Sequence, residues 1–227
     1  MLICNSDGRF NKKELVTQSK IYLKPNDKLE KFATNKIIPK EIRALTLEAL
    51  SYFPDLVNTK IDFQFKNNIT GSVMQAQPKV GSLFLHAKDN RSYKIKISRF
   101  LFLEDNPIPI EELPSDVLLG WIGHELGHIQ DYVNRSSFDL LGFGIKYYLS
   151  NDFVTKAEIA ADSFAVAHGL GGKIIATKNF VLNHDQMPLA YKQKIEALYL
   201  SPGEILSMVD PEMGENPEAE NKSSDSL

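Results

Sequence analysis

The chain contains 227 residues, 43% of them hydrophobic, and carries a formal net charge of −3 at pH 7. This length and apolar content are sufficient for one compact domain, and the charge argues against nucleic acid as a partner. Cys4 is the only cysteine, so no internal disulfide can form, which favours a reducing compartment. Without a signal-peptide pattern or a run of about 18 uncharged apolar residues, we expect a cytoplasmic protein with no integral membrane segment.

The first half of the chain predicts one helix followed by a small sheet. Residues 39–53 have helical apolar spacing, and Pro39 suits a first helical position. Three strand-like runs follow, at residues 61–65, 81–88 and 92–98. The sequence K-D-N-R suits a turn between the last two runs. Because Lys94 and Lys96 alternate with apolar neighbours, we expect an antiparallel sheet with one wet face.

The second half of the chain is predicted to be helical. Five helices are expected, at residues 115–134, 136–150, 154–168, 189–200 and 201–209. Gly169 is expected to end the third of them in a left-handed conformation. Residues 210–227 contain six acids, one lysine and almost nothing apolar, so they predict a disordered acidic tail.

The expected fold class is therefore α+β, with a small antiparallel sheet beside a mainly helical C-terminal half. We expect a single domain over residues 1–209. Its sheet-rich part would cover about 55–105, and its helical part about 115–209.

Residues 124–128 read H-E-L-G-H and fall within the first predicted helix of the second half. Residues four apart share one face of a helix, so two imidazoles there can converge on a tetrahedral ion. A hydrolytic zinc site adds a third protein ligand and an open position for water. Glu125 would then take a proton from water whose pKa the metal lowers to about 7. The alternative is a helix surface on which His124, Glu125 and His128 are ordinary polar side chains.

A second motif, E-I-A-A-D at residues 158–162, offers the missing ligand. Glu158 and Asp162 are four apart among small apolar residues, where burying two unpaired acids would be costly. Glu158 as a zinc ligand, with Asp162 accepting the second ring N–H of a ligand histidine, would give both acids a partner. The alternative is an amphipathic helix whose two acids are solvated.

Together, H-E-L-G-H and E-I-A-A-D-S-F-A resemble the gluzincin clan of zinc metallopeptidases. The residues of the two motifs look most like those of the HtpX-like peptidases with their small soluble minigluzincin relatives, or of the ImmA/IrrE-like regulatory proteases. The resemblance covers residues 120–168. It implies a zincin-like fold and one zinc ion held by His124, His128 and Glu158. It also implies Glu125 as general base, a peptide or protein substrate, and an edge strand that binds this substrate by β-augmentation.

Gluzincins often use a further side chain to stabilise the oxyanion. His168, His184 and Tyr191 follow the glutamate helix and are candidates for this role. Each also has an ordinary interpretation: His168 suits a helix C-terminus, His184 a loop and Tyr191 an apolar face. The leading hypothesis is a zinc-dependent endopeptidase. The alternatives are a regulatory or interaction protein that retains a structural zinc site, and a zinc-free helical binding module.

Overall fold

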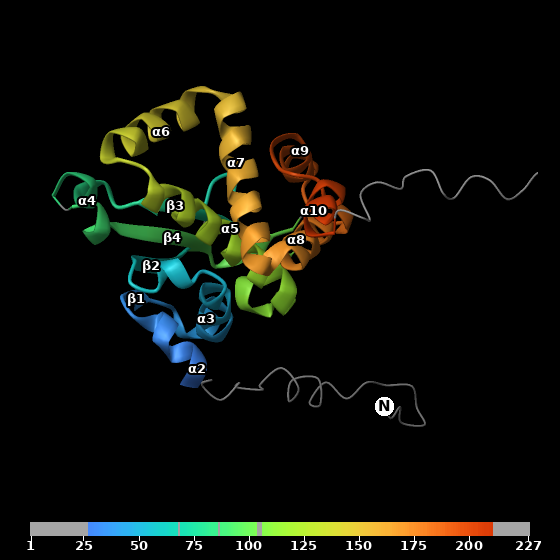
Figure 1. The fold of residues 1–227 in the computed structure, drawn as a ribbon. Coiled ribbons are helices and arrows are strands. Elements are labelled where there is room, and N and C mark those ends of the chain that lie inside the picture. The colour runs from blue at the N-terminus through green and yellow to red at the C-terminus, as the bar shows by residue number, and fades with distance from the viewer. Residues whose placement is uncertain (1–26, 68, 86, 104–105, 211–227) are drawn as a thin grey trace, which may run out of the picture.

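The computed structural model describes residues 27–67, 69–85, 87–103 and 106–210, and its fold is α+β (Figure 1). The expected class is therefore confirmed. The proposed acidic tail lies outside the described residues, except for Asp210. No helix in the described ranges combines the length and apolar content that crossing a membrane requires.

The main sheet is mixed rather than antiparallel. Its four strands are β1 (Lys36–Ile37), β2 (Lys60–Lys66), β3 (Met74–Pro78) and β4 (Ser92–Ser98), in the order β1-β2-β4-β3. Strands β1, β2 and β4 pair in parallel, whereas β3 runs antiparallel to β4 and forms one edge. A second, two-stranded sheet joins β5 (Phe100–Phe102) to β6 (Pro107–Pro109). The antiparallel prediction was wrong because the chain crosses over between β2 and β4.

The element predicted at 81–88 is also corrected. Residues Val80–Leu85 form helix α4 and Lys88–Asn90 form a 3-10 turn, so the predicted hairpin does not exist. A short apolar run is compatible with either a helix or a strand. The strand that pairs antiparallel with β4 is β3, whose sequence M-Q-A-Q-P has weak strand propensity. Helix formation at 39–53 is confirmed, as a 3-10 turn at Lys40–Ile42 and α3 (Arg43–Ser51).

Six helices build the C-terminal half. They are α5 (Ser115–Asn134), α6 (Ser137–Leu149), α7 (Asn151–Ala165), α8 (Gly171–Asn183), α9 (Leu189–Leu198) and α10 (Pro202–Val209). Five of them match the predicted helices, whereas α8 was not predicted. Gly169 has φ +87° in a π-helical turn between α7 and α8, so it marks a kink rather than the start of a loop.

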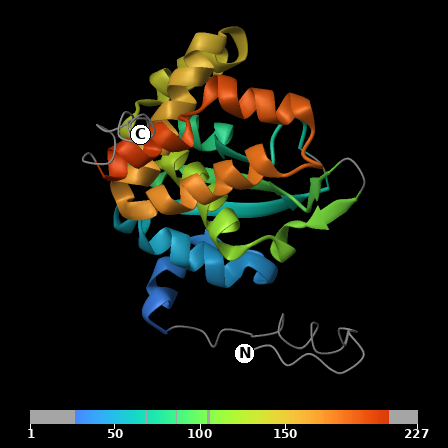
Figure 2. The same ribbon diagram turned by 90° about the vertical axis from the view of Figure 1, so that its right-hand side faces the viewer.

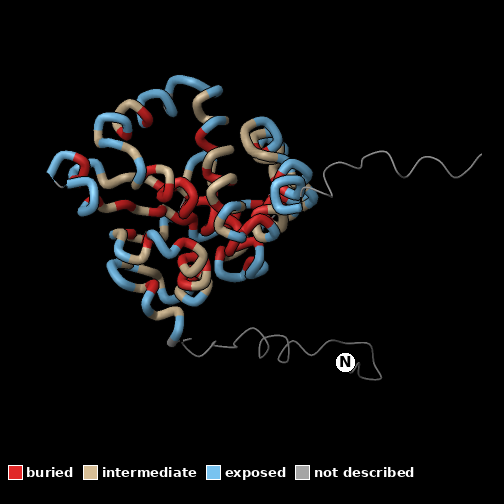
Figure 3. Tube along the Cα trace, in the orientation of Figure 1, coloured by how far each residue is buried: buried red, intermediate tan, exposed pale blue. Residues whose placement is uncertain are grey.

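Helix α5 is the centre of the molecule. It packs against α3, β3, α7 and α8, and Figure 3 shows the buried backbone gathered in this region. Figure 2 views the molecule from the side of α8, α9 and α10, coloured orange to red. A Cβ atom at Gly127 would lie 2.2 Å from the Ala161 carbonyl oxygen of α7, and one at Gly120 would lie 2.2 Å from the Lys173 carbonyl oxygen of α8. These two glycines therefore permit the close approach of three helices.

Candidate metal centre

Helix α5 carries the first part of the site. His124, Glu125 and His128 are 8%, 5% and 6% exposed, so they are buried rather than solvated. The two imidazole rings lie one turn apart, with centroids 4.8 Å apart and planes nearly perpendicular. The alternative of three ordinary surface residues is therefore wrong.

Glu158 enters the site from α7, which packs along α5. Its Oε2 atom lies 3.0 Å from His124 Nε2 and 3.4 Å from His128 Nε2. Ligand atoms about 2.0–2.1 Å from a tetrahedral zinc ion lie roughly 3.3 Å from one another. Two imidazole nitrogens and one carboxylate oxygen have the chemistry of a three-ligand site, and all three atoms lie within 4.8 Å of one another. This buried group could hold a metal ion.

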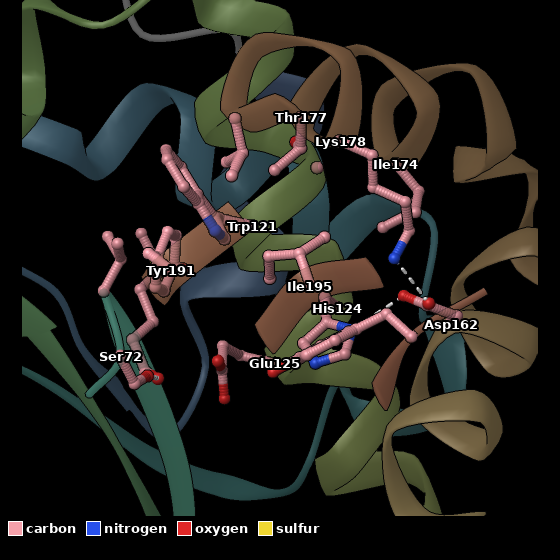
Figure 4. Close-up of a pocket in the computed structure, with 15 residues that line it drawn as sticks. Ser72, Trp121, His124, Glu125, Asp162, Ile174, Thr177, Lys178, Tyr191 and Ile195 are labelled. Atoms are coloured by element: carbon pink, nitrogen blue, oxygen red, sulfur yellow. Dashed lines mark hydrogen bonds and ion pairs between the residues drawn. The ribbon is translucent and has the colours of Figure 1, made fainter. Parts of the chain in front are cut away.

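Asp162 lies behind His124. Its Oδ1 atom is 2.9 Å from His124 Nδ1, and its Oδ2 atom forms an ion pair of 2.9 Å with Lys178 Nζ of α8 (Figure 4). Asp162 and Lys178 are 1% and 5% exposed. The contact orients the His124 ring so that Nε2 faces Glu158, an arrangement that would fix the tautomer of a metal ligand. The solvated-acid interpretation of this helix is therefore also wrong.

The acids around His124 change its titration. Burial by itself lowers the pKa of His124, but hydrogen bonds to Asp162 and Glu158 and their negative charges outweigh it and raise the pKa to about 10. Without a metal, the ring is therefore a cation at neutral pH. A metal ion would have to displace that proton to bind the ring nitrogen.

Glu125 points away from this cluster, toward the edge strand. Its Oε2 atom accepts a 2.5 Å hydrogen bond from the backbone N–H of Ala76 in β3. Burial raises the pKa of Glu125, while the two neighbouring histidines oppose the shift. Figure 4 shows the carboxylate between α5 and the segment at Ser72 that leads into β3.

Two tyrosines support the ligand side. The Tyr147 hydroxyl of α6 donates a 2.5 Å hydrogen bond to Glu158 Oε1, which leaves Oε2 for the histidines. The Tyr199 ring lies 5.5 Å from the His124 ring and beneath the Lys178 ammonium, 4.7 Å from it. Burial raises the pKa of both phenols, so both remain protonated near neutral pH.

A pocket opens beside Glu125. His124, Glu125 and Asp162 line it together with Trp121, Lys178 and Tyr191 (Figure 4). Its remaining walls come from Ser72–Met74, α8, α9 and Tyr199. The acid next to the candidate metal ligands is therefore accessible to a small bound group.

The three candidate oxyanion stabilisers have different positions. Tyr191 lines the pocket with Glu125, and its partly buried side chain shares this lining with Trp121 and Val73. His168 stacks on Phe53 with centroids 4.4 Å apart and bonds the Phe164 carbonyl oxygen, outside the pocket lining. His184 accepts a hydrogen bond from the backbone N–H of Gln186 and is likewise not part of the lining.

Sequence reasoning missed Lys178, Tyr147 and Tyr199. Lys178 belongs to α8, the helix that was not predicted. Nothing in the sequence around this lysine indicated that it is buried. Tyr147 sits in an aromatic run whose partner Glu158 is 11 residues away, so no short motif joins them. The buried acid Asp162 was the one available signal, because a second basic group could be expected to pair with it.

Comparison of the chain with protein-family models, curated proteins and solved structures finds no match. Any assignment of function therefore depends on the chemistry of this site.

Proposed function

We propose that this chain is a zinc-dependent endopeptidase of the gluzincin type. His124, His128 and Glu158 hold one zinc ion, Glu125 acts as general base, and Asp162 positions His124. The observation that carries the proposal is the position of Glu125. It is a buried carboxylate beside the three-ligand group, held by β3 and facing a pocket. A purely structural zinc site has no need of such a further acid beside its ligands.

Zinc, when bound, supplies a Lewis acid that polarises a carbonyl group and lowers the pKa of water to about 7. Glu125 takes the proton of the attacking water and delivers it to the leaving amine. The hydrogen bond from Ala76 fixes Oε2 of this carboxylate and leaves Oε1 to carry the proton. The raised pKa of Glu125 favours this role, because a general base works best when its pKa lies near the working pH.

The other residues hold the site in shape. Asp162 and Lys178 keep the His124 ring turned toward the metal, and Tyr147 holds the distal oxygen of Glu158. Tyr191 is the candidate that can reach a bound carbonyl from the pocket wall. Its raised pKa keeps the phenol protonated, as a hydrogen-bond donor must be.

The experiment compares zinc-loaded wild type with Glu125→Gln at matched metal content in a peptide-library digest read by mass spectrometry. We expect cleavage by the wild type and at least about a hundredfold loss in the variant, with one zinc per chain in both. Glu112→Gln, at an exposed glutamate just before α5, is the matched control and should cleave normally. If none of the three proteins cleaved any peptide although each bound zinc, the structural-zinc alternative would be supported. Failure to bind zinc would remove the metal site itself.

A further inference from the structure

A second pocket adjoins the first and has a different chemistry. Its lining includes Ile69, Phe100, Leu101, Phe102, Met187 and Tyr191. Small residues, Gly71 and Ser72 among them, complete the wall. None of the lining residues is charged, whereas the first pocket contains a histidine, two acids and a lysine.

The two pockets share a wall. Ser72, Val73 and Tyr191 line both of them, so Tyr191 separates the polar space around Glu125 from the apolar space beyond. Ser72 and Val73 lead directly into β3, the strand whose Ala76 holds Glu125. A strand advances about 3.3 Å per residue, so a ligand extended along β3 would reach the apolar pocket within about four residues of Glu125.

The rim of the apolar pocket exposes two phenyl rings. Phe100 and Phe102 are 37% and 49% exposed, and their rings lie 6.4 Å apart in a tilted arrangement. Contiguous apolar surface at a concave site, close to polar functional groups, is typical of ligand recognition. The loop that forms the opposite wall is fixed by Lys194 Nζ of α9, which donates to the Gly71 carbonyl oxygen at 2.6 Å.

We propose that this apolar pocket is a specificity subsite for one large apolar side chain of a peptide. The ligand would be an extended segment carrying Phe, Leu or a similar residue within about four positions of the bond next to Glu125. This inference rests on the proposed function for its substrate class, but the binding preference can be measured without catalysis.

The test uses Glu125→Gln protein, which keeps the pocket, and fluorescent peptides that differ at one position as Phe, Leu, Ala or Asp. Equilibrium binding is followed by fluorescence polarisation. We expect Phe or Leu peptides to bind at least about tenfold more tightly than the Ala peptide. Phe102→Asp in this background should remove most of that preference. Phe84→Asp is the matched control, since Phe84 is an exposed phenylalanine of α4 outside the pocket, and it should preserve the preference.

Phe102→Ala keeps the pocket uncharged and should reduce the same preference to a smaller extent. Equal binding of all four peptides, or equal effects of Phe102→Asp and Phe84→Asp, would overturn the subsite. Binding selectivity without any cleavage by wild type would leave the subsite standing and refute the peptidase. Cleavage that depends on Glu125 but not on the apolar residue of the peptide would support the peptidase and overturn the subsite.

Discussion

Helix α5 separates two unlike surroundings. On the side of α7 and α8, His124 and His128 meet charged groups that pair with one another: Glu158, Asp162 and Lys178. On the side of β3, Glu125 meets one backbone N–H and an accessible pocket. The same five-residue motif thus contacts an ion-paired cluster on one side and a backbone donor on the other, and one pocket is lined by residues of both sides.

Because of this difference, we expect substitutions to separate metal retention from chemistry. Changes on the α7 and α8 side should alter affinity for the ion, whereas a change at Glu125 should spare it. The ion-paired side of α5 carries most of the buried charged groups. Such groups are expensive to leave without a partner.

The largest expected effect is the loss of metal-linked stability in Glu158→Gln. Zinc at about a thousand times its Kd should raise the free energy of unfolding of the wild type by about 4 kcal/mol. The variant removes the carboxylate oxygen shared by both histidines, so zinc should stabilise it far less. Denaturation with zinc and with a chelator measures both values, and Glu112→Gln should behave as the wild type does. Equal stabilisation of the Glu158→Gln protein would contradict the assigned ligand set.

The next prediction concerns pH. Below a pKa of about 10, the His124 ring of the metal-free protein carries a proton that zinc must displace. Metal affinity should therefore rise with pH, by up to about tenfold per unit, across the neutral range. Calorimetry in buffers of different ionisation enthalpy should detect about one proton released at pH 7. Asp162→Asn removes the negative charge beside the ring and should lower this number; unchanged proton release in the variant would show that the charge of Asp162 does not set the titration.

The sequence predicted which polar residues lie together around α5 better than it predicted the strand pairing. The H-E-L-G-H spacing is local, and α5, Ser115–Asn134, lies within one or two residues of the predicted helix. Glu158 and Asp162 could be inferred because two acids among alanines need partners. Lys178 could not, because a lysine within an unpredicted helix resembles a solvated residue until Asp162 is placed against it.

The missed helix α8, the missed strand β3 and the wrong strand direction all depend on contacts between residues far apart in the sequence. The sequence of α8 begins with Gly171 and Gly172, which suggest a loop, yet the kink at Gly169 passes directly into this helix. The parallel pairing of β2 with β4 depends on a crossover that no short pattern encodes. Strand β3 is stabilised by its contacts with β4 and α5 rather than by its own strand propensity. Because its sequence contains two glutamines and no β-branched residue, the sequence did not predict a strand there.

The smallest expected effects come from a pair of identical substitutions at two glycines. Gly127→Ala would place a Cβ atom 2.2 Å from the Ala161 carbonyl oxygen, so α5 and α7 must separate next to His128. We expect it to lower the free energy of unfolding by about 1–3 kcal/mol and to weaken zinc binding. Gly142→Ala, in α6, meets no atom within 4 Å and should raise the free energy of unfolding by about 0.5–1 kcal/mol, since alanine favours the helix.

Urea denaturation of the two alanine variants, each with and without zinc, measures this contrast. Changes of opposite sign in the free energy of unfolding would show that the tight packing lies between α5 and α7. Separating these two helices would also move Glu158 away from the histidines. If both substitutions stabilised the protein equally, the close contact between α5 and α7 would not constrain the site. A Gly127→Ala protein that lost stability but kept its zinc affinity would mean that the helices can separate without displacing Glu158 from the histidines.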